Sequence, residues 1–177
     1  MAQIFNLGDL KAKQQKTTQK KIIPKKTNEP NGKTLSILKV TLANWDGTIK
    51  GNAYRVLSIP TEKTLDKLAE AILDSFDFDM DHMYGFYDNI KMWSRSTESY
   101  TMDDESENPT GLVTDTLIGE VFQKPKKKLL FLFDYGDEWK FVVELVKEIE
   151  ADGKTKLSTQ VIESKGDAPP QYPDFEA

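Results

Sequence analysis

One stretch of the sequence carries acids at a spacing that could bind a cation. Residues 77–88, DFDMDHMYGFYD, contain Asp77, Asp79 and Asp81, followed directly by His82, the single histidine of the chain. A calcium loop of the EF-hand type has glycine at its sixth position and glutamate at its twelfth, where this stretch has histidine and aspartate. We therefore expect an acidic loop that ends a helix and leads into a strand, with the three aspartates as candidate metal ligands within it.

A second stretch, FDYGDEW at residues 133–139, places two acids and a glycine between two apolar runs. Such residues form either a catalytic or metal site, or the turn that reverses the chain. We favour the turn, with Gly136 at a positive φ angle and with Asp134 or Asp137 capping free N–H groups. The site interpretation stays open for a candidate functional cluster, which comprises His82, Asp134, Asp137, Glu138 and Trp139.

Composition excludes several kinds of chemistry. The chain has no cysteine, so thiolate catalysis, disulfides and cysteine-ligated zinc are impossible, and one histidine cannot form a histidine-rich metal site. Arg55 and Arg95 are the only arginines, too few for the charge stabilisation that a serine resolvase needs. No phosphate-binding glycine loop, nucleophile elbow or HExxH helix is present. We expect no cofactor, and we expect a binding protein rather than an enzyme.

Charge divides the chain into a basic leader and an acidic body. The 177 residues carry a net charge of −5, but residues 1–33 carry +6 and the remainder carries −11. Like-charged segments with few aromatic residues are typically disordered, so we expect residues 1–33 to be flexible. Nucleic acid could bind only through the leader, whose candidate contacts are Lys11, Lys13, Lys16, Lys20, Lys21, Lys25 and Lys26.

No apolar run reaches the length of a membrane span, and the N-terminus lacks a signal-peptide pattern, so we expect a cytoplasmic protein without a membrane partner. The length suits one domain, which we place at residues 34–165, with an acidic exposed loop at 97–111 and a proline-rich tail at 166–177.

Hydrophobic periodicity predicts the elements that must position the two stretches. Residues 34–43 and 54–59 alternate like the strands of a hairpin, and the spacing of apolar residues after Thr64 predicts one main helix. We predict a further strand at 83–87 and a short helix within 117–122. The run LLFLF predicts a central strand, and 138–150 predicts a long half-buried strand with Trp139, Phe141, Val143, Leu145 and Ile149 on one face.

These segments together resemble a known family. The run LFLFDYGDEWKFVVEL, taken with LSIPTEKTLDKLAEAILDSFDFDMDHMYGF and ILKVTL, is similar to the plasmid pRiA4b ORF-3-like family from Thr34 to Glu163. The resemblance implies an α+β fold in which a curved, mostly antiparallel sheet packs on one main helix. It implies no activity, although some members are labelled transposon resolvases and the family is therefore associated with mobile elements. Family members often carry a histidine where this chain has Phe141.

Three functions remain open. The first is a non-enzymatic module that binds an unknown protein partner through an exposed edge, the acidic loop or the segment APPQYP. The second is a nucleic-acid accessory protein that uses the lysine leader. The third is a metal-assisted hydrolase, in which Asp134 and Asp137, with Asp81 as a further candidate ligand, hold a cation and His82 activates water.

Overall fold

Eight strands form one open sheet in the structure, a computed structural model that describes residues 34–103, 108–152, 155 and 157–173. In chain order the elements are β1 (Thr34–Leu42), β2 (Tyr54–Pro60), α1 (Leu65–Ser75), β3 (Tyr84–Tyr87), the 3-10 helix η1 (Trp93–Arg95), β4 (Ser99–Thr101), β5 (Gly111–Leu112), α2 (Ile118–Val121), β6 (Lys128–Phe133), β7 (Trp139–Glu150) and β8 (Gln160–Lys165). The predicted leader, residues 1–33, lies outside the described residues.

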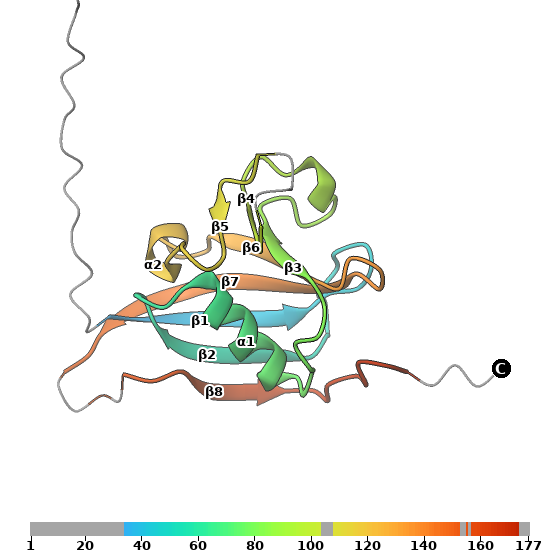
Figure 1. The fold of residues 1–177 in the computed structure, drawn as a ribbon. Helices are drawn as coiled ribbons and strands as arrows, with labels where there is room; N and C mark the ends of the chain where they lie inside the picture. Colours follow the sequence, from blue (N-terminus) through green and yellow to red (C-terminus); the bar gives the residue numbers. More distant parts are fainter. Residues whose placement is uncertain (1–33, 104–107, 153–154, 156, 174–177) are drawn as a thin grey trace, which may run out of the picture.

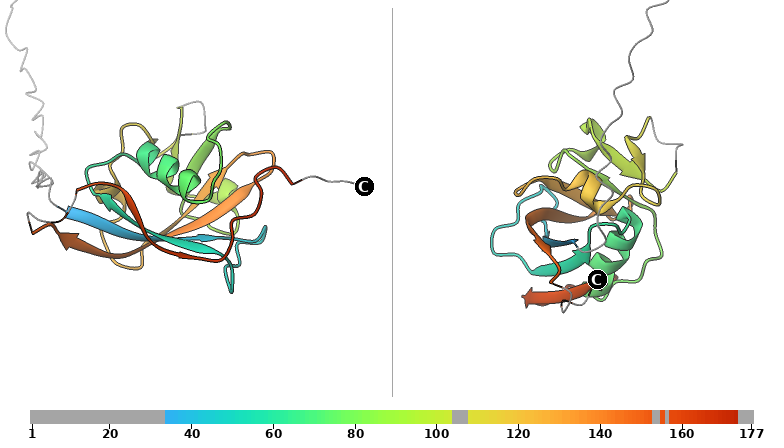
Figure 2. Two further views of the ribbon diagram at one scale, coloured as in Figure 1. Left: turned by 90° about the horizontal axis from the view of Figure 1, so that it is seen from below. Right: turned by 90° about the vertical axis from the view of Figure 1, so that its left-hand side faces the viewer.

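The strands follow the order β5-β4-β3-β6-β7-β1-β2-β8 across the sheet (Figure 1). Neighbouring strands are antiparallel except for β4 and β5, which are parallel. Figure 2 shows the sheet twisting beneath α1, the one main helix, which lies over one face. The predicted α+β class is therefore confirmed at the level of one open sheet with one main helix, and the described part of the protein is mostly sheet. Within the described ranges, no helix is both long enough and apolar enough to cross a membrane.

Helix α1 begins where the sequence predicts. The side-chain oxygen of Thr64 accepts a hydrogen bond from the Lys67 backbone N–H at 3.4 Å, and Asp66 lies in the first turn, near the positive end of the helix dipole. The apolar stripe of the helix is buried against the sheet, and it consists of Leu65, Leu68, Ala69, Ile72 and Leu73. This packing forms the main core of the protein.

Strand β6 lies in the middle of the sheet and is covered on both faces, as the unbroken run LLFLF predicts. Phe131 faces α1 and is completely buried, with ring centroids 4.9 Å from Phe86 and 5.8 Å from Phe141. Leu130 and Leu132 point the other way, into a smaller cluster with Tyr87. The hairpin of β6 and β7 is thus the centre of both cores.

One face assignment on β7 was wrong. Leu38 pairs with Leu145 but Ile37 pairs with Lys147, so Val146 is an extra residue, a β-bulge. The bulge shifts the alternation, and Ile149 pairs with Leu35 on the face opposite to Leu145. A single-residue bulge leaves no mark in the hydrophobic pattern, so the sequence could not reveal this change.

The acidic segment 97–111 also differs from the expected exposed loop. It contains β4 and the start of β5, which extend the sheet beyond β3, and Tyr100 on β4 is only 7% exposed. Strands of three and two residues are too short to show alternation, which is why the pattern indicated a loop. Residues 104–107 lie outside the described part of the chain.

The face opposite α1 is covered near β3 by Ile90, Trp93 and Tyr135, which pack on the smaller cluster. The Tyr87 and Tyr135 hydroxyls form a hydrogen bond of 2.7 Å over the β3 backbone. A Cβ atom on Gly85 would stand 2.9 Å from the Tyr87 hydroxyl and 3.0 Å from that of Tyr135. It would also stand 2.9 Å from the backbone carbonyl oxygen of Tyr100 on β4, so glycine is required at this position.

Candidate functional site

His82 lies between two carboxylates from different parts of the chain. Its Nε2 atom is 3.2 Å from Asp134 Oδ2, in the turn between β6 and β7. Its Nδ1 atom is 3.2 Å from Asp81 Oδ1, in the loop before β3. The structure therefore brings together His82 and Asp134 from the predicted cluster, and it adds Asp81 as a third member.

The segment that follows β8 also contacts this cluster. Gln171 is 8% exposed and donates from Nε2 to the Asp79 carbonyl at 3.1 Å and to Asp81 Oδ1 at 3.0 Å. The Tyr172 hydroxyl donates to Asp81 Oδ2. This bond lowers the pKa of Asp81 and raises the pKa of Tyr172 to about 12. Residues 166–177 were expected to form a tail separate from the domain, but the described part of this segment contacts the domain here.

The turn between β6 and β7 is a hairpin turn, but its geometry differs from the predicted one. Asp134 caps it, because Oδ1 accepts hydrogen bonds from the N–H groups of Gly136 at 2.8 Å and Asp137 at 3.3 Å. The positive φ angles belong to Asp134 (57°) and Glu138 (53°), not to Gly136. Aspartate tolerates this conformation because its side chain bonds to nearby backbone groups. Asp134 thus caps the turn with one oxygen and contacts His82 with the other.

The surroundings of His82 determine what its ring can do. A general base, like a metal ligand, must present an unprotonated ring nitrogen to water or to the metal, whereas both nitrogens of His82 face carboxylate oxygens. The ring can donate to both carboxylates only when both nitrogens carry a proton. Among the described residues, no group of three or more acidic, histidine or cysteine side chains is placed to hold a metal ion. The arrangement is suited to joining three segments of the chain.

Two other members of the predicted cluster lie apart from His82. Asp137 is exposed at the tip of the turn. Trp139 packs beside the main core, with its ring centroid 4.9 Å from that of Phe78. Its buried Nε1 atom has no hydrogen-bond partner in the described part of the protein. The five residues therefore do not converge on one site.

The three aspartates of residues 77–81 do not converge either. Asp77 has a positive φ angle of 60° just after the end of α1. Asp79 contacts Gln171 through its backbone, whose N–H donates to Gln171 Oε1 at 2.7 Å. Only Asp81 turns its carboxylate toward His82. The next element is the strand β3, as the acidic-loop interpretation predicts.

Glu138 belongs to a second polar network, on the face opposite α1. Its carboxylate accepts hydrogen bonds from Trp93 Nε1 at 2.9 Å and from Lys140 Nζ at 2.7 Å. The Lys140 ammonium also donates to the Trp45 carbonyl at 2.8 Å. The bond from Lys140 is the main cause that lowers the pKa of Glu138. This network ties the start of β7 to two surface segments.

Sequence reasoning missed Lys140, Trp45 and Trp93. Strand alternation assigns Lys140 to a polar, solvated face, yet the residue is only 6% exposed. Trp45 lies between the two strands of the predicted hairpin, and a large aromatic residue in such a connection is the signal that could have indicated it. A pocket of about 400 Å³ lies beside the network and includes Trp45, Lys91, Met92 and Glu138 in its lining.

The chain belongs to the plasmid pRiA4b ORF-3-like protein family, whose model matches residues 34–172. The resemblance read from the sequence is thereby confirmed, and the match extends to the segment that contacts His82. Among solved structures, the chain is similar to MM3350, a protein of unknown function from Methanosarcina mazei Go1. The two share 18% identity and a TM-score of 0.60, over 78% of this chain and 73% of that one, so this likeness concerns the fold alone. No curated protein matches the chain.

Proposed function

We propose that this protein is a binding module that recognises another protein through a surface centred on Trp45. This surface, called the Trp45 surface below, comprises Trp45, Met92 and the pocket beside them. The observation that carries the proposal is the exposure of the Trp45 side chain, which is 85% accessible although its backbone is fixed. Tryptophan is enriched at the energetic centres of protein interfaces, because burying its large ring contributes strongly to binding.

The loop that carries Trp45 is held in place by its own hydrogen bonds. Thr48 donates to Asp46 Oδ1 from both its N–H group, at 3.0 Å, and its hydroxyl, at 2.8 Å. The side-chain amide of Asn52 donates to the Leu42 carbonyl at 2.9 Å. A loop that is already ordered loses little conformational entropy on binding, so more of the contact energy remains for affinity. This supports a preformed contact surface.

The chemistry of the pocket favours a protein partner with an apolar side chain. Two acids and two lysines belong to the lining, and the pair formed by Glu138 and Lys140 is hydrogen-bonded at 2.7 Å. Hydrogen bonds from Thr48 lower the pKa of Asp46, which also interacts with Lys91. Because these charges balance, the pocket offers little attraction to a phosphate backbone. Trp45 and Met92, at 85% and 46% exposure, supply the apolar contact.

Site-specific cross-linking tests this proposal. A photoreactive residue is placed either at Met92 or at Val146, a control position on β7 with the same 46% exposure. We expect a partner protein from a native lysate to be captured from position 92 and not from position 146. With that partner purified, Trp45→Ala should weaken binding about 30-fold or more, the effect of a central interface tryptophan. Equal capture at both positions, or unchanged affinity in Trp45→Ala, would reject the Trp45 surface.

The other two functions stay predictions. Nucleic-acid binding depends on leader lysines that lie outside the described residues, and deletion of residues 1–33 should abolish salt-sensitive DNA binding if it exists. Hydrolysis would need a cation or a water molecule beside His82, whose two ring nitrogens both face carboxylates. The geometry therefore supports the binding module better than the other two functions.

A further inference from the structure

The two edges of the sheet differ in length and protection. The edge at β5 is a two-residue strand, whereas the other edge is β8, six residues that are all exposed. β8 pairs with β2 on one side only, so its outer backbone groups have no strand beside them in the described part of the chain. Val161 and Ile162 are 47% and 53% exposed on this strand. An exposed edge of this length can accept another strand.

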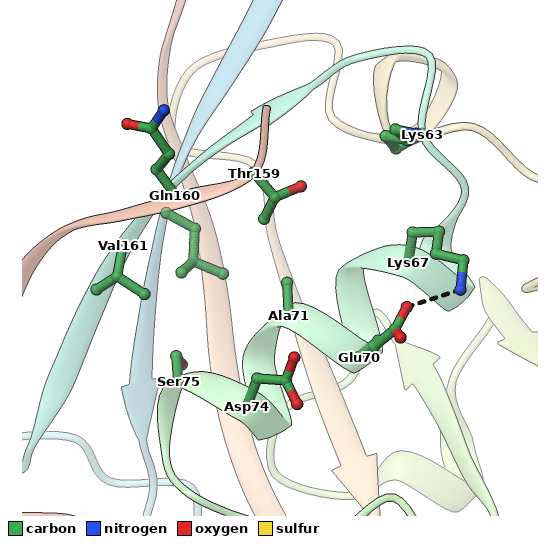
Figure 3. Close-up of a pocket in the computed structure, with 10 residues that line it drawn as sticks. Lys63, Lys67, Glu70, Ala71, Asp74, Ser75, Thr159, Gln160 and Val161 are labelled. Atoms are coloured by element: carbon green, nitrogen blue, oxygen red, sulfur yellow. Dashed lines mark hydrogen bonds and ion pairs between the residues drawn. The ribbon is translucent and has the colours of Figure 1, made fainter. Parts of the chain in front are cut away.

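A groove runs between β8 and α1 on the helix-covered side of the sheet (Figure 3). Its volume is about 400 Å³, with Ala71 on the helix flank and Val161 on the strand. Val161 pairs with Leu57, a residue of the main core, so its side chain belongs to this side of the sheet. A strand added outside β8 would direct every second side chain toward the helix flank.

The charged side chains along the groove favour one orientation of a bound peptide. In the middle, Lys67 and Glu70 neutralise each other at 2.7 Å (Figure 3). At the ends, the exposed side chains of Lys63 and Asp74 form no ion pair with any described residue. Lys63 lies just before α1, and the helix from Leu65 to Asp74 spans about 14 Å, close to the roughly 13 Å that four residues of a strand span.

We propose that β8 binds an extended segment of a partner polypeptide as an additional antiparallel strand. α1 and β8 run in roughly the same direction (Figure 1), so an antiparallel segment passes from the Asp74 end to the Lys63 end. The bound segment carries a basic residue, an apolar residue two positions later and an acidic residue after two more. The basic side chain faces Asp74, the apolar one covers Ala71 and Val161, and the acidic one faces Lys63.

This site is separate from the Trp45 surface, because the groove lies on the helix-covered side of the sheet and the Trp45 pocket adjoins Lys140 and Trp93 on the other. A partner could therefore engage either site independently, and the two proposals are tested by different residues.

Amide chemical shifts measured by NMR test the inference with two peptides of identical composition. The first is the heptapeptide Thr-Lys-Thr-Val-Thr-Glu-Thr, and the second exchanges its lysine and glutamate. We expect the lysine-first peptide to shift the β8 amides and to bind about fivefold or more tightly than the exchanged peptide, as two exposed ion pairs permit. In the double variant Lys63→Glu with Asp74→Lys, this preference should reverse. Both positions are exposed, so the fold should be retained.

A matched pair of strand variants locates the binding. Val161→Lys should abolish the shifts, whereas Val146→Lys, at 46% exposure on β7, should leave them unchanged. Absence of β8 shifts with either peptide would overturn the inference, as would equal binding of both peptides or shifts confined to the Trp45 surface. Self-association that Val161→Lys abolishes would also overturn it, because the occupant of β8 would then be a second copy of the chain.

Discussion

On the face that α1 covers, Phe131 is completely buried among other aromatic rings, whereas on the opposite face Trp45 stands 85% exposed. The two faces also differ in their polar groups. On the covered face the buried cation is Arg55, whose Nε donates to the Ser75 carbonyl at 2.8 Å, whereas on the opposite face it is Lys140, whose ammonium bonds to the Glu138 carboxylate. Burial of aromatic area stabilises the first face, and an ordered polar network on the second leaves an aromatic side chain available for contact. This comparison predicts that stability and binding depend on different residues.

The largest effect should come from the main core. Phe131→Ala removes a fully buried ring and should lower the free energy of unfolding by about 3–5 kcal/mol. Trp45→Ala, which removes a larger but exposed side chain, should change it by less than about 0.5 kcal/mol. Urea denaturation followed by circular dichroism measures both values. A large decrease in the free energy of unfolding of Trp45→Ala would contradict the expectation that the two faces serve stability and binding separately.

A smaller loss of stability should follow from removing Lys140 from its polar network on the opposite face. Lys140→Met keeps the apolar stem but removes the ammonium that bonds to Glu138 and to the Trp45 carbonyl. We expect the free energy of unfolding to fall by about 2 kcal/mol. This is a low value for removing one partner of a buried ion pair, because the Glu138 side chain is 39% exposed and water can solvate it.

The control is Lys91→Met, an exposed lysine of the same pocket, which should leave stability unchanged within about 0.5 kcal/mol. Equal urea midpoints for Lys140→Met and the wild type would show that the network contributes nothing to folding.

The smallest effect concerns pH and the contact of Tyr172 with Asp81. The pKa of Asp81 is lowered in the folded state, so its contribution is present above the unfolded value of 3.8 and is lost as the pH falls through the folded pKa. The pKa of Tyr172 is raised from 10.0 to about 12, so its contribution is present below 10.0 and is lost as the pH rises toward 12. The segment that follows β8 should therefore keep its contact with Asp81 throughout the neutral pH range.

Absorbance titration of the tyrosines checks this prediction. In Asp81→Ala, one of the six tyrosines should ionise closer to pH 10 than it does in the wild type. Asp137→Ala, which removes an exposed carboxylate of the neighbouring turn, serves as the control and should not alter the curve. Superimposable curves for Asp81→Ala and the wild type would mean that Tyr172 does not donate to Asp81 in solution.

Sequence patterns predicted the main helix and the strands that have a buried face. The cap at Thr64, the buried stripe of α1 and the pairing of LLFLF with β7 all follow from residue type and spacing, because each depends on neighbours along the chain. The short strands β4 and β5, the bulge at Val146 and the edge strand β8 escaped prediction. The first three involve only one to three residues, for which periodicity carries no signal, and the six residues of β8 are all exposed, so they show no buried face.

The candidate site was predicted only in part. Proximity of His82 to Asp134 follows from the pairing of β3 with β6, and the sequence indicated both residues without showing that they meet. Asp137 and Trp139 were grouped with them because they are adjacent in sequence, but turn geometry directs these side chains elsewhere. Gly136 was assigned the positive φ angle because glycine adopts it most easily, yet Asp134 and Glu138 adopt it instead.

The sequence by itself determined the family, the single main helix, the central hairpin and the absence of cysteine chemistry, since these depend on composition and local periodicity. Only the tertiary structure decided that Asp81 meets Tyr172, that Lys140 is buried and that β8 forms an exposed edge beside α1. These three features join residues far apart in the chain. Their contacts depend on strand order and on the packing of the sheet against the helix, which no local pattern encodes.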